Sequence, residues 1–298
     1  MTVGKDAETI AGMIEQDART AGAAVTCGIC PHNCSLAEGR TGLCRARSCR
    51  GGAVVSDSYG ILTALALDPI EKKPFYHFFP GRRILSAGSF GCNMRCAFCQ
   101  NSGISMIGAD ELPSVEKMQP AQLVEAALSA RSSGNIGLAY TYNEPLVGYE
   151  YVLDCAAPAS AAGLQNVLVT NGFINPTPLQ DLLPHIQAMN IDLKGFSEGY
   201  YKKLGGDLST VMETIKMAAG VCHVEITTLV VPGENDSEEE IASLAAWLAG
   251  ISPDIPYHIS RFFPRWQMMD REPTPVRQIY ALANVARKHL RYVYEGNC

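Results

Sequence analysis

The sequence lacks the segments that would carry a protein into or across a membrane. No uninterrupted apolar run is long enough to span a bilayer. No apolar core of a secretory signal precedes the first domain, because residues 1–20 are interspersed with charges. Basic residues are not in excess either, since 24 Lys and Arg stand against 30 Asp and Glu, a formal net charge of −6. We therefore expect a cytoplasmic protein that binds no membrane, and we do not expect it to act on nucleic acid.

Internal repeats are also missing, and the 298 residues, 47% of them hydrophobic, are enough for one large core. Eleven cysteines in a chain with no visible export signal are not expected to form a disulfide framework. We expect them to serve metal or redox chemistry, so their spacing carries the functional information.

From Arg83 onward, short β-branched runs alternate with helix-like segments, which predicts consecutive parallel βαβ units. We expect an α/β fold, a partial (β/α)6 barrel of the TIM type, with its reactive groups at the carboxyl ends of the strands. The domain boundaries we expect are an N-terminal helix over 1–24, a Cys-rich segment and linker over 25–82, and the barrel over 83–298. The predicted strands are 84–90, 136–142, 166–172, 189–195, 223–232 and 257–263, and predicted helices include 120–131, 237–248 and 275–289.

Cys92, Cys96 and Cys99 form a C-x3-C-x2-C motif directly after the first predicted barrel strand. A [4Fe–4S] cluster has four irons, so three thiolate ligands leave one iron open to bind a small molecule. The alternatives are a structural zinc loop that borrows a fourth ligand and three incidental core cysteines. The spacing, the aromatic Phe98 before the last cysteine and the barrel position all favour the catalytic cluster.

A second cysteine group precedes this motif with the spacing C-x2-C-x3-C-x9-C-x4-C. The segment has too little apolar content to fold unaided, which favours a bound metal over free thiols. The sequence does not choose between zinc and an auxiliary iron–sulfur cluster. The expected ligands are Cys27, Cys30, Cys34 and Cys44, with Cys49 as a spare.

The chain resembles the radical S-adenosylmethionine (SAM) superfamily, through CGICPHNC, DPIEKKPFYHFFPG, GCNMRCAFCQN, TYNEP, NIDLKGF, EITTLVVPGEND, HISRFFP and YVYEGN. Within it the chain is most similar to the AmmeMemoRadiSam family, related to pyruvate formate-lyase activating enzymes. The resemblance implies an oxidoreductase that cleaves SAM at the open iron and uses the 5′-deoxyadenosyl radical to abstract hydrogen from a substrate. It also implies flavodoxin or ferredoxin as electron donor and Memo-like and AMMECR-type proteins as partners.

The resemblance further implies which residues bind SAM. In TYNEP, backbone oxygens and the Glu144 carboxylate would meet its amino group. Plainer interpretations exist: Asn171 begins a good turn dipeptide, Asp192 and Lys194 suit an internal ion pair, and PGEND suits a helix entry. The implied cofactor-binding residues are Phe98, Thr141, Tyr142, Asn143, Glu144, Thr170, Asn171, Asp192, Lys194 and Val231.

Three residues are candidates to contact a substrate: His77 in the segment before the first barrel strand, and His258 and Arg261 on the last predicted strand. A lone strand histidine is also explained as a satisfied core residue. The substrate itself, a small molecule or a protein, stays open. The alternatives are a glycyl-radical activating enzyme and, in another class, a non-catalytic Fe–S or zinc scaffold, which the complete three-cysteine motif disfavours.

Overall fold

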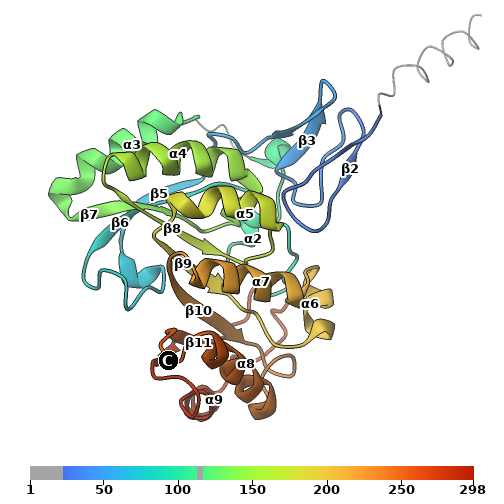
Figure 1. Ribbon diagram of the computed structural model, residues 1–298. Coiled ribbons are helices and arrows are strands. Elements are labelled where there is room, and N and C mark those ends of the chain that lie inside the picture. The colour runs from blue at the N-terminus through green and yellow to red at the C-terminus, as the bar shows by residue number, and fades with distance from the viewer. Residues whose placement is uncertain (1–22, 113–116) are drawn as a thin grey trace, which may run out of the picture.

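The computed structural model describes residues 23–112 and 117–298, and its centre is an eight-stranded sheet in the order β12-β11-β10-β9-β8-β7-β6-β5 (Figure 1). Neighbouring strands from β6 to β12 run parallel, whereas β5 pairs antiparallel with β6. The strands are β5 (Ala64–Pro69), β6 (Arg83–Gly88), β7 (Asn135–Tyr140), β8 (Gln165–Thr170), β9 (Ala188–Asp192), β10 (His223–Val230), β11 (Tyr257–Arg261) and β12 (Val293–Gly296).

The partial α/β barrel predicted from the sequence is confirmed, and all six predicted strands are present as β6 to β11. The six predicted βα units are therefore present, and the sheet has two further strands, β5 and β12. Strand β5 lies in the segment expected to be a linker, and its antiparallel pairing falls outside the βαβ pattern. Strand β12 has only four residues, so its alternation is too short to recognise. The helix expected over 1–24 falls almost wholly outside the described residues.

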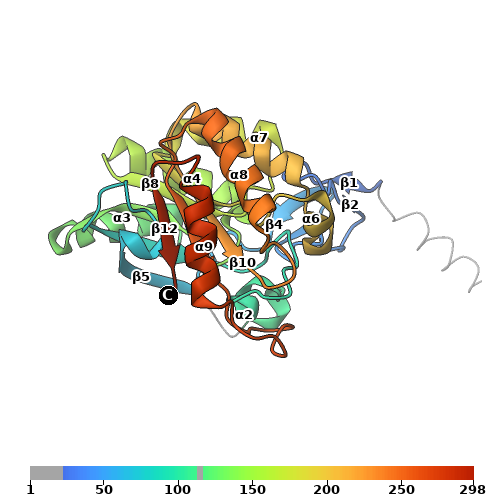
Figure 2. The same cartoon turned by 90° about the horizontal axis from the view of Figure 1, so that it is seen from below.

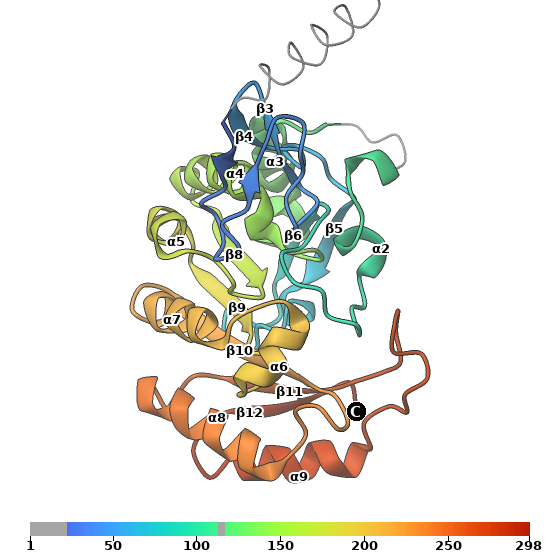
Figure 3. The ribbon, with the colours of Figure 1, turned by 90° about the vertical axis from the view of Figure 1, so that its right-hand side faces the viewer.

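Helices follow the strands and cover the outer face of the sheet, where they form a column in Figure 3. Segments 120–131, 237–248 and 275–289 are confirmed as α3, α8 and α9. In the part of the chain that the structure describes, no helix is both long and apolar enough to cross a membrane. The helices are α2 (Ser102–Ser105), α3 (Pro120–Ser129), α4 (Tyr149–Ala161), α5 (Pro176–Leu182), α6 (Glu198–Leu204), α7 (Leu208–Ala219), α8 (Glu238–Ile251) and α9 (Val276–Ala286), with 3-10 turns at Ile70–Lys72, Ala109–Glu111, Ala130–Ser133, Pro145–Gly148 and Leu183–His185.

Local sequence explains these helices. Helix α8 begins after Ser237, whose side chain accepts the Glu240 N–H, and three glutamates in its first turn complement the helix dipole. Its apolar face, with Leu244 and Leu248 fully buried, packs onto the sheet. Each such leucine contributes about 1.5–3 kcal/mol when it leaves water.

The N-terminal segment forms two small antiparallel pairs beside the barrel (Figure 2), β1 (Val25–Thr26) with β2 (Ser35–Leu36) and β3 (Arg47–Arg50) with β4 (Ala53–Ser56). Arg47 on β3 fixes this segment to α4. Its guanidinium pairs with both carboxylate oxygens of Glu150 at 2.7 and 2.6 Å and donates to the Val147 carbonyl at 3.1 Å.

Candidate active site

A cavity of about 580 Å³ lies at the carboxyl ends of the barrel strands. Its wall is built from residues at the ends of the parallel strands, or in the loops directly after them, together with residues 71–74 and Tyr76. All three cysteines of the C-x3-C-x2-C motif line it. Other predicted residues that line the same cavity are Phe98, Thr141, Tyr142, Asn143, Glu144, Thr170, Asn171, Asp192, Lys194 and His258.

The three cysteines lie in the loop after β6, and the loop supplies hydrogen bonds of its own. The Met94 N–H donates to the Cys92 sulfur at 3.4 Å, and the Cys99 N–H donates to the Cys96 carbonyl at 3.0 Å. Burial raises the pKa of Cys92 well above its usual range and that of Cys96 to about 11. A bound metal would offset this desolvation and restore the thiolates, so the donor set fits an iron–sulfur cluster.

Among residues 23–112 and 117–298, no three His, Cys, Asp or Glu side chains are arranged around one point as ligands of a single ion. This arrangement does not argue against the three cysteines as cluster ligands, because a [4Fe–4S] cluster binds each thiolate at a different iron.

Asn143 holds the start of the cysteine loop. Its side-chain oxygen accepts the Ser89 N–H at 2.9 Å, and its side-chain nitrogen donates to the carbonyls of Phe90 and Gly91 at 3.0 and 3.2 Å. The sequence suggested only a backbone role for Asn143 in cofactor binding. The structure adds this positioning role, which depends on contacts between residues about fifty positions apart.

Glu144 is buried and joins two segments, its own loop after β7 and the turn after β8. One carboxylate oxygen accepts the Leu146 N–H at 3.0 Å and the Thr170 hydroxyl at 2.7 Å, and the other accepts the Asn171 N–H at 2.8 Å. Burial raises the pKa of Glu144 to about 7, although these donors act in the opposite direction. The carboxylate retains acceptor capacity for a further donor, such as an ammonium group.

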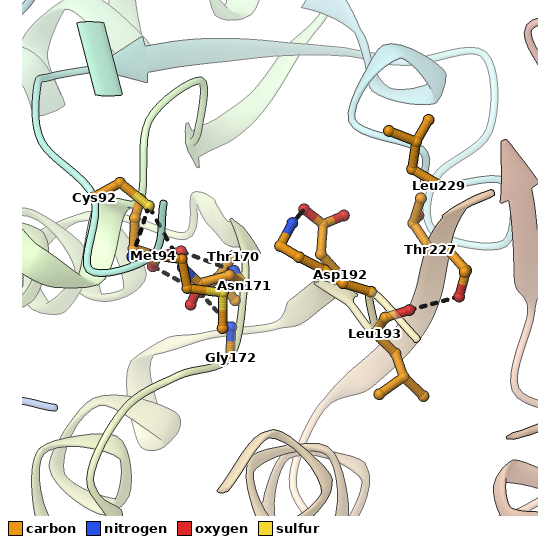
Figure 4. Close-up of polar contacts among 12 residues, drawn as sticks. Cys92, Met94, Thr170, Asn171, Gly172, Asp192, Leu193, Thr227 and Leu229 are labelled. Atoms are coloured by element: carbon orange, nitrogen blue, oxygen red, sulfur yellow. Dashed lines mark hydrogen bonds and ion pairs between the residues drawn. The ribbon is translucent and has the colours of Figure 1, made fainter. Parts of the chain in front are cut away.

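The turn after β8 reaches the cysteine loop directly. The Asn171 side-chain nitrogen donates to the Asn93 side-chain oxygen at 2.9 Å and lies 3.7 Å from the Cys92 sulfur. Figure 4 shows Cys92 and Asn171 close together, with Asp192 and Thr227 across from them. Asn93 was not predicted, because nothing in its local sequence indicates contact with a turn almost eighty residues away.

Asp192 and Lys194 form an ion pair of 2.9 Å on the cavity wall. Burial acts to lower the pKa of Lys194, but the charges of Asp192 and Cys96 outweigh it and raise that pKa well above its usual range. Asp192 is the register partner of Thr227, which is in turn the partner of His258. Asp192, Thr227 and His258 therefore lie side by side in one row across β9, β10 and β11.

A second charged group borders the cavity beside Tyr142, whose backbone has a positive φ of 73°. The Tyr142 hydroxyl donates to Asp68 at 2.7 Å, and the buried Lys73 ammonium pairs with the same carboxylate at 2.9 Å. Lys73 also lies 4.1 Å from the centre of the Tyr142 ring. Asp68 was not predicted, because β5 was not recognised as a strand of the barrel.

The remaining predicted residues lie elsewhere. Val231 is buried and does not border the cavity. One ring nitrogen of His77 lies 2.6 Å from the Tyr294 hydroxyl. Arg261 donates to the Thr274 carbonyl at 2.6 Å. Neither His77 nor Arg261 borders the cavity, so of the three candidate substrate residues only His258 does.

Comparison with known proteins places these features in a family. The model of the radical SAM superfamily matches residues 88–245. An uncharacterized protein of Methanocaldococcus jannaschii is 39% identical over 92% of this chain and 81% of its own length. The isethionate sulfite-lyase activating enzyme of Desulfovibrio desulfuricans is 26% identical to this chain. The matched region covers 56% of this chain and 54% of that enzyme.

Among solved structures, a radical SAM methyltransferase from Sphaerobacter thermophilus superposes with a TM-score of 0.55 at 16% identity, over 73% of this chain and 67% of that one. That likeness concerns the fold. The family match covers more than half of the sequence and includes the cysteine loop and the strands that carry most of the cavity wall. The chain belongs to the radical SAM superfamily.

Proposed function

We propose that Cys92, Cys96 and Cys99 hold a [4Fe–4S] cluster and that the 580 Å³ cavity binds SAM against it, so that the enzyme abstracts a hydrogen atom from a further substrate. The observation that carries this proposal is the meeting of three thiols and several charged or amide groups on one cavity wall at the carboxyl ends of the strands. When bound, the cluster supplies the electron that divides SAM into methionine and a 5′-deoxyadenosyl radical.

The residues of this chain would hold and tune the ligands of the cluster. The Met94 N–H and the Asn171 amide lie near the Cys92 sulfur, where they would stabilise the charge of its thiolate. Asn143 would keep the loop at the distance that the cluster needs, because it binds three consecutive backbone groups of that loop.

The charged groups on the wall would orient SAM. Its carboxylate would meet Lys194, and its ammonium would meet Glu144 or the backbone oxygens of residues 141–143. Asp192 would accept from the ribose hydroxyls. Thr170, Asn171, Phe98 and Val231 complete the proposed set; Val231 would act through packing, since it lies outside the cavity lining.

His258 is our candidate to contact the substrate, because it lies at the far end of the row that starts at Asp192 and crosses Thr227. Its neighbours at that end of the cavity include Tyr76 and Ser260. For His77 and Arg261 a substrate contact stays a prediction from the sequence.

A second candidate function is activation of a glycyl-radical enzyme, which the likeness to an isethionate sulfite-lyase activating enzyme favours. In that case the hydrogen donor is a glycine of a protein partner. The resemblance to the AmmeMemoRadiSam family supports instead a substrate shared with Memo-like or AMMECR-type proteins. In either case we propose a cytoplasmic enzyme that receives its electron from flavodoxin or ferredoxin.

The decisive experiment is anaerobic reconstitution with iron and sulfide, followed by reduction and chromatography for 5′-deoxyadenosine after SAM is added. We expect product from the native chain and none from Cys96→Ala. Cys155→Ala is the matched control, because Cys155 is buried on α4 away from the cavity lining. A well-formed cluster that yields no 5′-deoxyadenosine would favour the non-catalytic scaffold.

A further inference from the structure

Four of the N-terminal cysteines border one small cavity of about 10 Å³. The turn between β1 and β2 gathers the first three, since the Cys27 N–H donates to the Cys34 carbonyl at 2.9 Å and the Asn33 N–H to the Cys30 carbonyl at 3.0 Å. Cys44 joins them from the following loop. Cys49 does not border this cavity, and its sulfur lies 3.7 Å from a Glu38 carboxylate oxygen.

A buried donor without an acceptor also borders the cavity. Arg47 is 4% exposed, and while its terminal nitrogens are bound to Glu150, its Nε has no hydrogen-bond partner among the residues that the structure describes. Leaving such a group unpaired costs about 1–3 kcal/mol. Because the other wall residues include four thiols, a thiolate or a sulfide would supply the missing acceptor.

The same cavity is connected to the proposed cluster loop. The Cys44 carbonyl accepts the Cys92 N–H at 3.2 Å. The His32 Nε2 atom lies 2.8 Å from the Asn93 carbonyl oxygen, and Asn93 itself borders the small cavity. Cys92 therefore lines the proposed SAM site, while the next residue, Asn93, borders the cavity of the four N-terminal thiols.

We propose that Cys27, Cys30, Cys34 and Cys44 bind a second metal centre, and that this centre positions the loop of Cys92. The centre is either a zinc ion or an iron–sulfur cluster, because both are thiophilic and both can be bound by four cysteine thiolates. Four protein ligands leave no open position, which fits a structural role. The positioning part rests on the proposed function of Cys92.

The arrangement of the thiols explains why binding would act on the loop. They border one cavity without converging on one point, and the cavity is small. A metal centre bound by the four thiolates would fix the position of Cys44. The hydrogen bond from the Cys92 N–H to the Cys44 carbonyl would then hold the loop in a defined place.

Metal content tests the site independently of the proposed function. In the full chain with Cys92, Cys96 and Cys99 all replaced by Ala, any tightly bound metal belongs to the second site. We expect about one centre per chain after anaerobic purification, with elemental analysis and acid-labile sulfide distinguishing zinc from a cluster. On this background Cys44→Ser should lose the metal and Cys49→Ser should keep it. Absence of metal from the triple variant, or equal loss of metal in Cys44→Ser and Cys49→Ser, would overturn the proposed metal site.

Electron paramagnetic resonance tests the positioning in chains that retain Cys92, Cys96 and Cys99. The signal of the reduced cluster, corrected for any signal of the triple variant, should change with SAM in the native chain and in Cys49→Ser. Cys44→Ser should alter or lose that response. His32→Gln keeps all four thiols, so it should keep the second metal and still alter the response to SAM. This variant tests the positioning role even if Cys44→Ser fails to fold. A native response in both variants would overturn the positioning role.

Discussion

The His258 Nε2 atom lies 2.6 Å from a carboxylate oxygen of Glu225, on neighbouring strands inside the barrel. Glu225 is fully buried and faces three further donors: the His223 ring at 3.0 Å and the backbone N–H groups of Tyr76 and His77 at 3.0 and 2.8 Å. Burial acts to raise the pKa of Glu225, but these donors outweigh it and lower that pKa to about 2. The carboxylate thus holds the segment before β6 against the barrel interior.

Acid should weaken this contact in a defined range. The pKa of Glu225 is depressed on folding, so its stabilisation is fully present above the ordinary value of 4.5 and is lost as the pH falls toward about 2. Over that range the native chain should lose about 3 kcal/mol more unfolding free energy than Glu225→Gln. Denaturant titrations at several pH values measure the difference. Glu272→Gln, at an exposed site, should follow the native chain.

Gly91→Ala should impair cluster binding. Gly91 has a φ of +84°, and an added Cβ would lie 2.6 Å from the Cys44 carbonyl oxygen, which is closer than such atoms approach. The loop must shift, and backbone strain of this kind costs about 1–3 kcal/mol. Iron content and visible absorption after reconstitution should fall several-fold. Gly103→Ala, with open space around the added atom, should reconstitute normally; equal iron in both would contradict the role of this close contact.

Lys194→Met should weaken SAM binding. The substitution removes the cation expected to meet the SAM carboxylate and leaves Asp192 without its partner at 2.9 Å. We expect the dissociation constant to rise by about tenfold or more, equivalent to about 1.4 kcal/mol per factor of ten. Equilibrium binding to the reconstituted enzyme measures it. Lys203→Met, which removes an exposed ammonium paired with Glu234, should bind SAM as the native chain does.

His258→Gln should separate the two halves of the proposed reaction. The side chain borders the cavity at the end away from the cysteines, so its loss should reduce substrate conversion while 5′-deoxyadenosine still forms without the substrate. Transfer of deuterium from a labelled substrate into 5′-deoxyadenosine is the measurement. His289→Gln, at an exposed site outside the cavity lining, should leave transfer unchanged. Equal loss in both variants would remove His258 from the substrate site.

The sequence was sufficient for features that depend on local spacing. Three cysteines within eight residues must lie close together, so their spacing alone predicts a common metal site. Polar segments at the strand ends predict a common cavity wall, because parallel strands end on the same side of the sheet. The same reasoning cannot reach the contact of Cys44 with Cys92 or the group formed by Asp68, Lys73 and Tyr142. Those depend on how β5 and the N-terminal turns pack against the barrel, which no local pattern determines.

The strand order also has a mechanical consequence. Strands β5 and β12 end the sheet on opposite edges without a backbone ladder between them. Instead, the segment after β5 reaches β12 through aromatic contacts: Tyr76 packs against Tyr294 with ring centres 4.9 Å apart, and His77 approaches the Tyr294 hydroxyl. This side of the barrel is therefore closed by the contacts of one irregular segment and not by strand pairing. Its shape depends on the side-chain conformations of Tyr76, His77 and Tyr294.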